Sequence, residues 1–188
     1  MIGGTARRRQ LKAPEVPGLR PTGDRVREAI FDILASRGAV DGASVLDAFA
    51  GSGALGIEAL SRGAGSVCFV ESDRRAVAAI RANLDSTGFA TAPGVRVVRA
   101  EVLDFLARDA GTRYDLALVD PPYSFVDWPS LLGLLDADLA VLESSLAVEV
   151  PGPFLVRREY RYGGTLVTLV EARRLRRDDT QSSEKDPV

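Results

Sequence analysis

From Ser44 onward, short apolar runs alternate with helical patterns, and this alternation limits the folds that the chain can adopt. Apolar runs predict strands at Ser44–Phe49, Ser66–Val70, Val95–Arg99, Tyr114–Val119 and Ser145–Val150. Helical patterns lie between them, at Ala54–Arg62, Asp73–Asp85, Val102–Arg108 and Trp128–Asp138. Repeating strand–helix units of this length predict an α/β fold, with a mostly parallel sheet and helices on both faces.

The end of the chain departs from this repeat. Phe154–Tyr160 and Thr165–Glu171 are strand-like runs joined across Gly163-Gly164, which predicts an antiparallel hairpin. Before the repeat, Asp24–Ala35 has the pattern of an amphipathic helix. We therefore expect a basic N-terminal arm with a hairpin-like shape, one main domain and a disordered polar tail, at residues 1–22, 23–175 and 176–188.

The composition is that of a soluble globular protein, with 46% hydrophobic and 27% charged residues in 188. No apolar run reaches the length of a membrane span, and the N-terminus lacks the apolar core of a secretory signal, so we expect a cytoplasmic protein. The single cysteine, Cys68, lies in an apolar run and is expected to be buried. The chain has no histidine, so we expect no metal site, and the chemistry must use carboxylates, backbone groups and a cofactor.

Positive charge gathers in the first twenty residues, where Glu15 is the only acid. A basic arm on an acidic body predicts a polyanionic partner that meets one region, with a solvated tail as the alternative. Two further cations on the following helix are candidates for the same role, although ordinary surface charge would also explain them. The candidate cations are Arg7, Arg8, Arg9, Lys12, Arg20, Arg25 and Arg27.

A glycine-rich stretch separates the first predicted strand of the repeat from its helix. Gly51 to Gly56 spells G-x-G-x-x-G, and Glu71 follows Gly51 by twenty residues, at the end of the next strand. Glycines permit the close approach of a ligand, and an acid at this spacing can accept from a ribose diol. This pattern fits NAD and S-adenosylmethionine equally.

Acidic residues favour S-adenosylmethionine over NAD. Asp47 directly precedes the loop, where it would repel a pyrophosphate but attract the ammonium and sulfonium of S-adenosylmethionine. Acids stand at four successive strand ends, where an open α/β sheet binds its ligands. For each acid alone, a helix cap or turn is the alternative. The four are Asp47, Glu71, Glu101 and Asp120.

The tetrad Asp120-Pro121-Pro122-Tyr123 follows an apolar strand. Its carboxylate can accept a hydrogen bond from an amine, its prolines leave carbonyls free to accept, and its ring can stack on a flat base. The tetrad therefore suggests a site for the exocyclic amine of a nucleobase. A plain strand stop followed by a turn is the alternative.

Four stretches together resemble the bacterial RsmD-type 16S rRNA guanine-N2 methyltransferases. They are Ile2-Gly3-Gly4, the segment Leu19–Glu28 (LRPTGDRVRE), the segment Asp47–Arg62 (DAFAGSGALGIEALSR) and the tetrad DPPY. The likeness runs from the N-terminus to the final hairpin. It implies a class I, Rossmann-like methyltransferase with a seven-stranded sheet, mostly parallel, closed by an antiparallel C-terminal hairpin strand.

The resemblance also implies a reaction and its residues. The donor would be S-adenosylmethionine, the product S-adenosylhomocysteine, and the substrate guanine 966 of 16S rRNA in the small ribosomal subunit or its assembly intermediate. The enzyme would act as a monomer away from membranes. The implied catalytic residues are Asp120, Pro121, Pro122 and Tyr123. The implied cofactor-binding residues are Asp47, Phe49, Gly51, Ser52, Gly53, Glu71, Ser72, Glu101, Val102 and Asp120.

Three alternatives stay open at this point. Related tetrads occur in adenine-N6 and glutamine-N5 methyltransferases, and the four residues alone would hold adenine as well as guanine. The glycine motif also permits an NAD-dependent oxidoreductase, which Asp47 and the missing histidine disfavour. A non-catalytic RNA-binding assembly factor on a cofactor fold is the third alternative.

Overall fold

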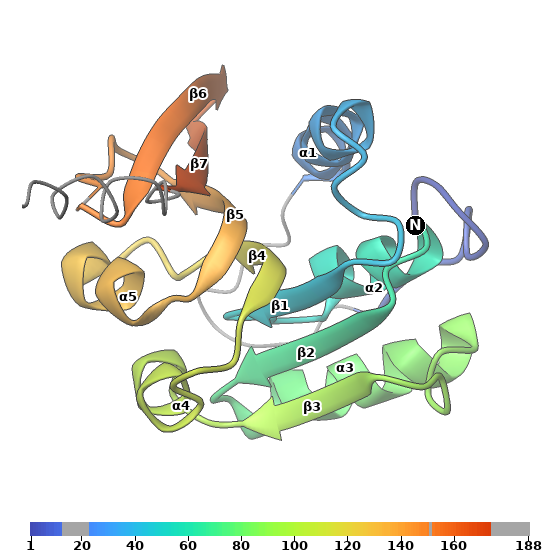
Figure 1. Cartoon of the computed structure of the whole chain (residues 1–188). Coiled ribbons are helices and arrows are strands. Elements are labelled where there is room, and N and C mark those ends of the chain that lie inside the picture. Colours follow the sequence, from blue (N-terminus) through green and yellow to red (C-terminus); the bar gives the residue numbers. More distant parts are fainter. Residues whose placement is uncertain (13–22, 151, 174–188) are drawn as a thin grey trace, which may run out of the picture.

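The computed structural model describes residues 1–12, 23–150 and 152–173 of the chain. Its strands form one seven-stranded sheet in the order β3-β2-β1-β4-β5-β7-β6 (Figure 1). The first five strands are parallel, whereas β7 runs antiparallel to both β5 and β6. The strands are β1 (Ser44–Ala48), β2 (Ser66–Glu71), β3 (Val95–Arg99), β4 (Tyr114–Val119), β5 (Ala137–Ser144), β6 (Phe154–Tyr162) and β7 (Thr165–Ala172).

Helices cover both faces of the sheet, as a mostly parallel arrangement requires. One face packs against α1, α2 and α3, through side chains such as Phe31, Ile57 and Ile80. The other face packs against α4 and α5, through Phe105 and Leu131. The helices are α1 (Asp24–Ser36), α2 (Ala54–Ser61), α3 (Arg74–Thr87), α4 (Val102–Arg108) and α5 (Trp128–Leu134).

Several predictions about the elements are confirmed. The two last strands form the expected hairpin across Gly163-Gly164. Asp73 caps α3, because its side chain accepts from the backbone N–H of Arg75 and of Ala76 at 2.6 and 3.0 Å. Cys68 is buried. The predicted boundary at residue 22 and the segment 176–188 lie outside the described residues.

One pair of predictions is wrong. The helix predicted at Trp128–Asp138 ends at Leu134, and the strand predicted at Ser145–Val150 is instead β5, Ala137–Ser144. The strand β5 is buried on both faces, because Leu139 and Val141 belong to the core under α1–α3 and Ala140 and Leu142 to the core under α4 and α5. A strand of this kind is apolar without alternation, and its pattern cannot be distinguished from a helix by periodicity.

Candidate active site

The carboxyl ends of the parallel strands bring a row of acids together. Asp47 is in β1, Glu71 ends β2, and Asp120 directly follows β4. Glu143 in β5 extends the row, because Val119 pairs with Leu142 and the next pair along is Asp120 beside Glu143. Leu118 and Val141 belong to the core under α1–α3, so the residues two positions further, Asp120 and Glu143, lie on the same face.

The glycine loop is built around Asp47. Asp47 Oδ2 accepts a 2.8 Å hydrogen bond from the backbone N–H of Gly56, in the first turn of α2. A Cβ at Gly56 would lie 2.3 Å from the Phe69 ring and 2.8 Å from Asp47 Oδ2, so only glycine allows α2 to approach the strands this closely. Gly51 and Gly53 both have positive φ, and so does Phe49 at +60°. The loop is therefore tightly bent over the strand ends.

Glu71 holds the other side of this loop. Its two carboxylate oxygens accept from the backbone N–H of Gly51 and of Asp73, both at 2.8 Å. Each oxygen keeps a second lone pair, so Glu71 can still accept from a ligand hydroxyl. Ser72 is half-buried beside it. Glu101 is exposed at the start of α4, next to the buried Val102.

The electrostatics of this edge favour a cation. Burial raises the pKa of Asp47 well above its ordinary range, the Gly56 N–H lowers it, and the charges of Asp120 and Glu71 raise it further. A positively charged ligand would relieve this repulsion, whereas a phosphate would add to it. This group of carboxylates thus fits S-adenosylmethionine better than a dinucleotide.

The tetrad lies at the end of β4, as predicted. The backbone N–H of Asp120 lies 3.5 Å from the carbonyl of Ala48, which joins the tetrad to β1. Pro121 is buried and Pro122 is exposed, and the Pro122 carbonyl accepts from Phe125 N–H at 2.8 Å. Tyr123 is 59% exposed, so its ring is available for stacking.

An aromatic row connects the glycine loop with the segment after the tetrad. The rings of Phe49 and Phe125 meet edge to face with centroids 5.2 Å apart. Phe125 meets Trp128 in the same manner at 5.4 Å. Such pairs stabilise by about 0.5–1.5 kcal/mol each beyond the area they bury. The row holds the two motifs at a fixed distance from each other.

The N-terminal arm is docked on α2. Glu58 is fully buried in α2 and accepts from the backbone N–H groups of Ile2 and Gly3 at 2.9 and 2.7 Å. Ser61 Oγ donates to the Gly3 carbonyl and accepts from Ala6 N–H, at 2.7 and 2.8 Å. The arm folds back on itself, because the Met1 amino group donates to the Arg9 carbonyl and the Met1 carbonyl accepts from Arg8 N–H.

Asn83 in α3 joins this arm to the glycine loop. Its Oδ1 accepts from Lys12 N–H at 2.8 Å, and its Nδ2 donates to the carbonyls of Lys12 and Ser52, both at 2.9 Å. Asn83 is fully buried. One side chain therefore contacts the end of the described arm and the loop that carries the predicted cofactor residues.

Most of the predicted RNA-binding cations that the structure describes are exposed, namely Arg7, Arg8, Arg9, Lys12 and Arg25. Arg27 is not. It is 6% exposed, and its Nη2 donates to Asp24 at 2.6 Å. Because Arg27 lies on the buried side of α1, this structure does not present it to a phosphate, and we correct its predicted role as a phosphate contact. Arg20 lies outside the described residues.

The chain matches the family described as "Conserved hypothetical protein 95" over residues 1–170. It is 42% identical to "Ribosomal RNA small subunit methyltransferase D" of Escherichia coli over 145 residues, which are 77% of this chain and 67% of that protein. The chain belongs to the RsmD-type rRNA methyltransferase family. The resemblance inferred from the motifs is confirmed. The chain is therefore a methyltransferase, and the oxidoreductase and the non-catalytic assembly factor are no longer alternatives.

The solved structures agree with the fold of this family. The yhhF protein of Escherichia coli is 38% identical with a TM-score of 0.78, covering 92% of this chain and 96% of that one. A more distant structure, SMU.776 in complex with SAH, is 16% identical with a TM-score of 0.63, covering 82% of this chain and 50% of that one. The predicted class I methyltransferase fold is confirmed, and the second likeness bears on the fold alone.

Sequence reasoning missed several residues of this RsmD-type site. Glu58 interrupts the apolar stretch of α2, and an acid in such a stretch is itself a signal of a buried partner. Asn83 has no comparable signal, because α3 is amphipathic and polar residues are expected on it. Glu143 follows an apolar run just as Asp120 does, and it was missed because its strand was misplaced.

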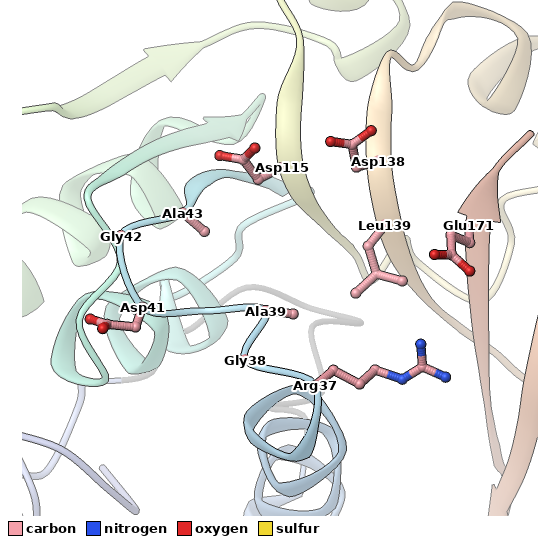
Figure 2. A pocket seen from close by; sticks show the side chains of 10 residues that line it. All are labelled: Arg37, Gly38, Ala39, Asp41, Gly42, Ala43, Asp115, Asp138, Leu139 and Glu171. Carbon is pink, nitrogen blue, oxygen red and sulfur yellow. The ribbon is translucent and has the colours of Figure 1, made fainter. Parts of the chain in front are cut away.

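A separate cavity of about 540 Å³ lies at the opposite end of the parallel strands (Figure 2). Its lining includes Asp115 and Asp138 near the starts of β4 and β5, and Arg37 just after α1. Open α/β sheets bind ligands at the carboxyl ends of their strands, so this cavity is not the candidate active site.

The part of the chain that the structure describes offers neither a metal-binding cluster nor a membrane-spanning helix. No group of three or more His, Cys, Asp or Glu residues there could hold a metal ion. No described helix is long and apolar enough to cross a membrane.

Proposed function

We propose that this RsmD-type enzyme transfers a methyl group from S-adenosylmethionine to the exocyclic N2 of a guanine in 16S rRNA. The resemblance implies guanine 966 of the small subunit or its assembly intermediate. One observation carries the proposal: Asp120, a hydrogen-bond acceptor for an amine, lies at the same sheet edge as the acid-lined glycine loop. The methyl donor and the amine would therefore meet at the ends of β1 and β4.

The chain's own residues fit the cofactor. Asp47 and the loop residues Phe49, Gly51, Ser52 and Gly53 would surround the methionine end, and Glu71 with Ser72 would hold the ribose. Glu101 and Val102 would lie near the adenine. When bound, S-adenosylmethionine supplies a methyl group on a cationic sulfur, and transfer leaves S-adenosylhomocysteine. The repulsion among Asp47, Glu71 and Asp120 supports a cationic ligand here.

Asp120 would prepare the acceptor amine. The guanine amine is a poor nucleophile because its lone pair is delocalised into the ring. Asp120 and the Pro121 carbonyl would accept its two hydrogens and turn it out of the ring plane, which frees the lone pair for the methyl carbon. Tyr123 would stack on the base, a contact worth about 1–3 kcal/mol in comparable sites. After transfer, the N2 proton would pass to Asp120 or to water.

The arm would bring the RNA to this edge. Arg7, Arg8, Arg9 and Lys12 are exposed on a segment that α2 and α3 hold in place, which supports a preformed set of phosphate contacts. Arg25 would join them from α1. We propose that the enzyme works as a monomer, and a ribosomal substrate implies work in the cytoplasm.

Replacing Asp120 tests the proposal. We expect Asp120→Ala to lower methyl transfer to unmethylated small-subunit RNA by at least about 10²-fold, because both positioning and acceptor strength are lost. Cofactor binding, measured by calorimetry, should persist. Asp104→Ala removes an exposed carboxylate of α4 and should behave as the unchanged enzyme. Normal turnover by the Asp120 variant, or a mapped product other than N2-methylguanine, would contradict the proposal.

A further inference from the structure

Two buried polar atoms in the described residues have no hydrogen-bond partner: Glu143 Oε1 and Arg27 Nε. Glu143 is 4% exposed and Arg27 is 6% exposed. Folded proteins pair nearly all of their buried donors and acceptors, so each exception calls for an explanation. Here one unpaired atom is an acceptor and the other is a donor.

Both residues lie at the edge that carries Asp120. Glu143 is beside Asp120 on the neighbouring strand, on the same face of the sheet, where neighbouring strands are about 4.8 Å apart. Arg27 comes from α1, which packs on that face. Burial is the main cause that raises the pKa of the Glu143 carboxyl, the charges of Asp120 and Asp47 raise it further, and the charge of Arg27 lowers it, so these groups lie close together.

These groups have the hydrogen-bonding types that complement the pairing edge of guanine. Along that edge guanine presents N2–H, then N1–H, then O6, which are donor, donor and acceptor. The protein presents the Asp120 carboxylate, the Glu143 oxygen and the Arg27 N–H, which are acceptor, acceptor and donor. Adenine presents its amine and then N1, which is an acceptor and would face the Glu143 oxygen. The tetrad alone does not make this distinction.

We propose that Glu143 selects guanine, by accepting its N1–H beside the amine that Asp120 holds, and that Arg27 donates to its O6. This inference rests on the proposed function. A carboxyl group keeps an acceptor oxygen whether or not it is protonated, so this contact does not require one charge state of Glu143. Both groups are buried, so the base must displace part of their cover. The Asp24 side chain that holds Arg27 is itself 86% exposed.

A base analogue tests whether Glu143 recognises guanine or only supports the enzyme in general. The substrate is small-subunit RNA carrying at its target either guanosine or 2-aminopurine riboside, which keeps the N2 amine but lacks N1–H and O6. We expect the unchanged enzyme to methylate guanosine about 10- to 100-fold faster, the discrimination of a good bidentate base contact. Glu143→Met, similar in volume but without the acceptor, should slow guanosine and leave 2-aminopurine almost unchanged. The ratio should then fall several-fold, and the preference that remains comes from the Arg27 contact to O6.

Controls keep the outcomes distinct. Glu149→Met removes an exposed carboxylate from the segment after β5 and should keep the full ratio. If the unchanged enzyme does not methylate guanosine N2, the proposed function fails before this inference is reached. If Glu143→Met slows both substrates equally, or neither, Glu143 does not read the base and the inference is wrong.

Thermal unfolding shows whether Glu143→Met folds. If it does not, a second variant tests the inference. Glu143→Gln keeps the shape and an amide oxygen that accepts N1–H, so it should keep the preference for guanosine over 2-aminopurine. Loss of the preference in a folded Gln variant would overturn the inference. Arg27→Met should lower the same ratio by removing the donor to O6.

Discussion

Asp47 combines a cost to stability with a benefit to binding. Its carboxylate is buried, accepts one backbone hydrogen bond and faces two other acids. The folded state therefore holds the Asp47 proton more tightly than the unfolded chain does. Above the ordinary pKa of aspartate this difference costs stability, and the cost is complete once the pH exceeds the raised pKa. Natural sites of this kind trade stability for function.

We expect Asp47→Asn to unfold at a higher temperature than the unchanged protein near neutral pH, in the absence of ligand. About 1 kcal/mol corresponds to about 2–4 °C in a domain of this size. The same change should weaken S-adenosylmethionine binding roughly tenfold, because a charge attraction in a poorly solvated site is lost. Thermal unfolding and calorimetry measure the two effects.

The pH dependence of the stability difference between the two proteins tests whether the charge of Asp47 causes it. As the pH falls through the raised pKa of Asp47, the unchanged protein becomes neutral at this position, and its difference from the Asn variant should shrink. A constant difference across that range would show that the charge of Asp47 is not the cause. Asp41→Asn, at an exposed position, should have little effect at any pH.

At the scale of elements, the arm depends on one glycine. Gly4 has φ +68°, and a Cβ there would lie 1.7 Å from the backbone oxygen of Ser61. Since that oxygen belongs to α2, it cannot move aside. Gly4→Ala should therefore detach the arm from α2 without disturbing the sheet. The RNA would then lose an ordered set of phosphate contacts.

We expect Gly4→Ala to weaken binding to small-subunit RNA roughly tenfold at physiological salt. The slope of log affinity against log salt should become smaller, by up to about 3 if all four described arm cations meet phosphates of a single strand. Filter binding over a salt series measures both. Gly38→Ala is the matched control, because Gly38 also has positive φ (+62°) but no atom within 4 Å of a built Cβ. Equal losses in the two variants would assign the effect to backbone strain alone.

At the scale of the molecule, Asn83 connects the RNA arm with the cofactor loop. Its side chain makes three hydrogen bonds to the backbone of Lys12 and Ser52 from a fully buried position. We expect Asn83→Ala to lower the free energy of unfolding by about 2–3 kcal/mol, since these backbone groups lose their partners. Binding of both RNA and S-adenosylmethionine should weaken in the same variant.

Denaturant unfolding and the two binding assays test this connection. Asp85→Ala changes an exposed position of the same helix and should leave all three measurements unaltered. Asn83 would have no part in joining the two sites if RNA binding and cofactor binding were both unchanged in a destabilised variant.

The fold was largely predictable because its signals are local. Each parallel strand contains a short apolar run, and the cap at Asp73 and the hairpin at Gly163-Gly164 follow from the chemistry of single residues. The strand β5 was misplaced for a physical reason. The helices on the two sides of the sheet help to bury both of its faces, and this burial removes the alternation that marks a strand.

The sequence by itself determined the kind of chemistry: a glycine loop preceded by an acid, the tetrad at Asp120, a basic arm and no histidine. Only the tertiary structure decided which distant residues complete the site. Glu143 reaches Asp120 through strand pairing, Arg27 turns inward because α1 packs on the sheet, and Glu58 and Asn83 hold the arm from two helices. These contacts join residues far apart in the chain, and local patterns carry no information about such pairings.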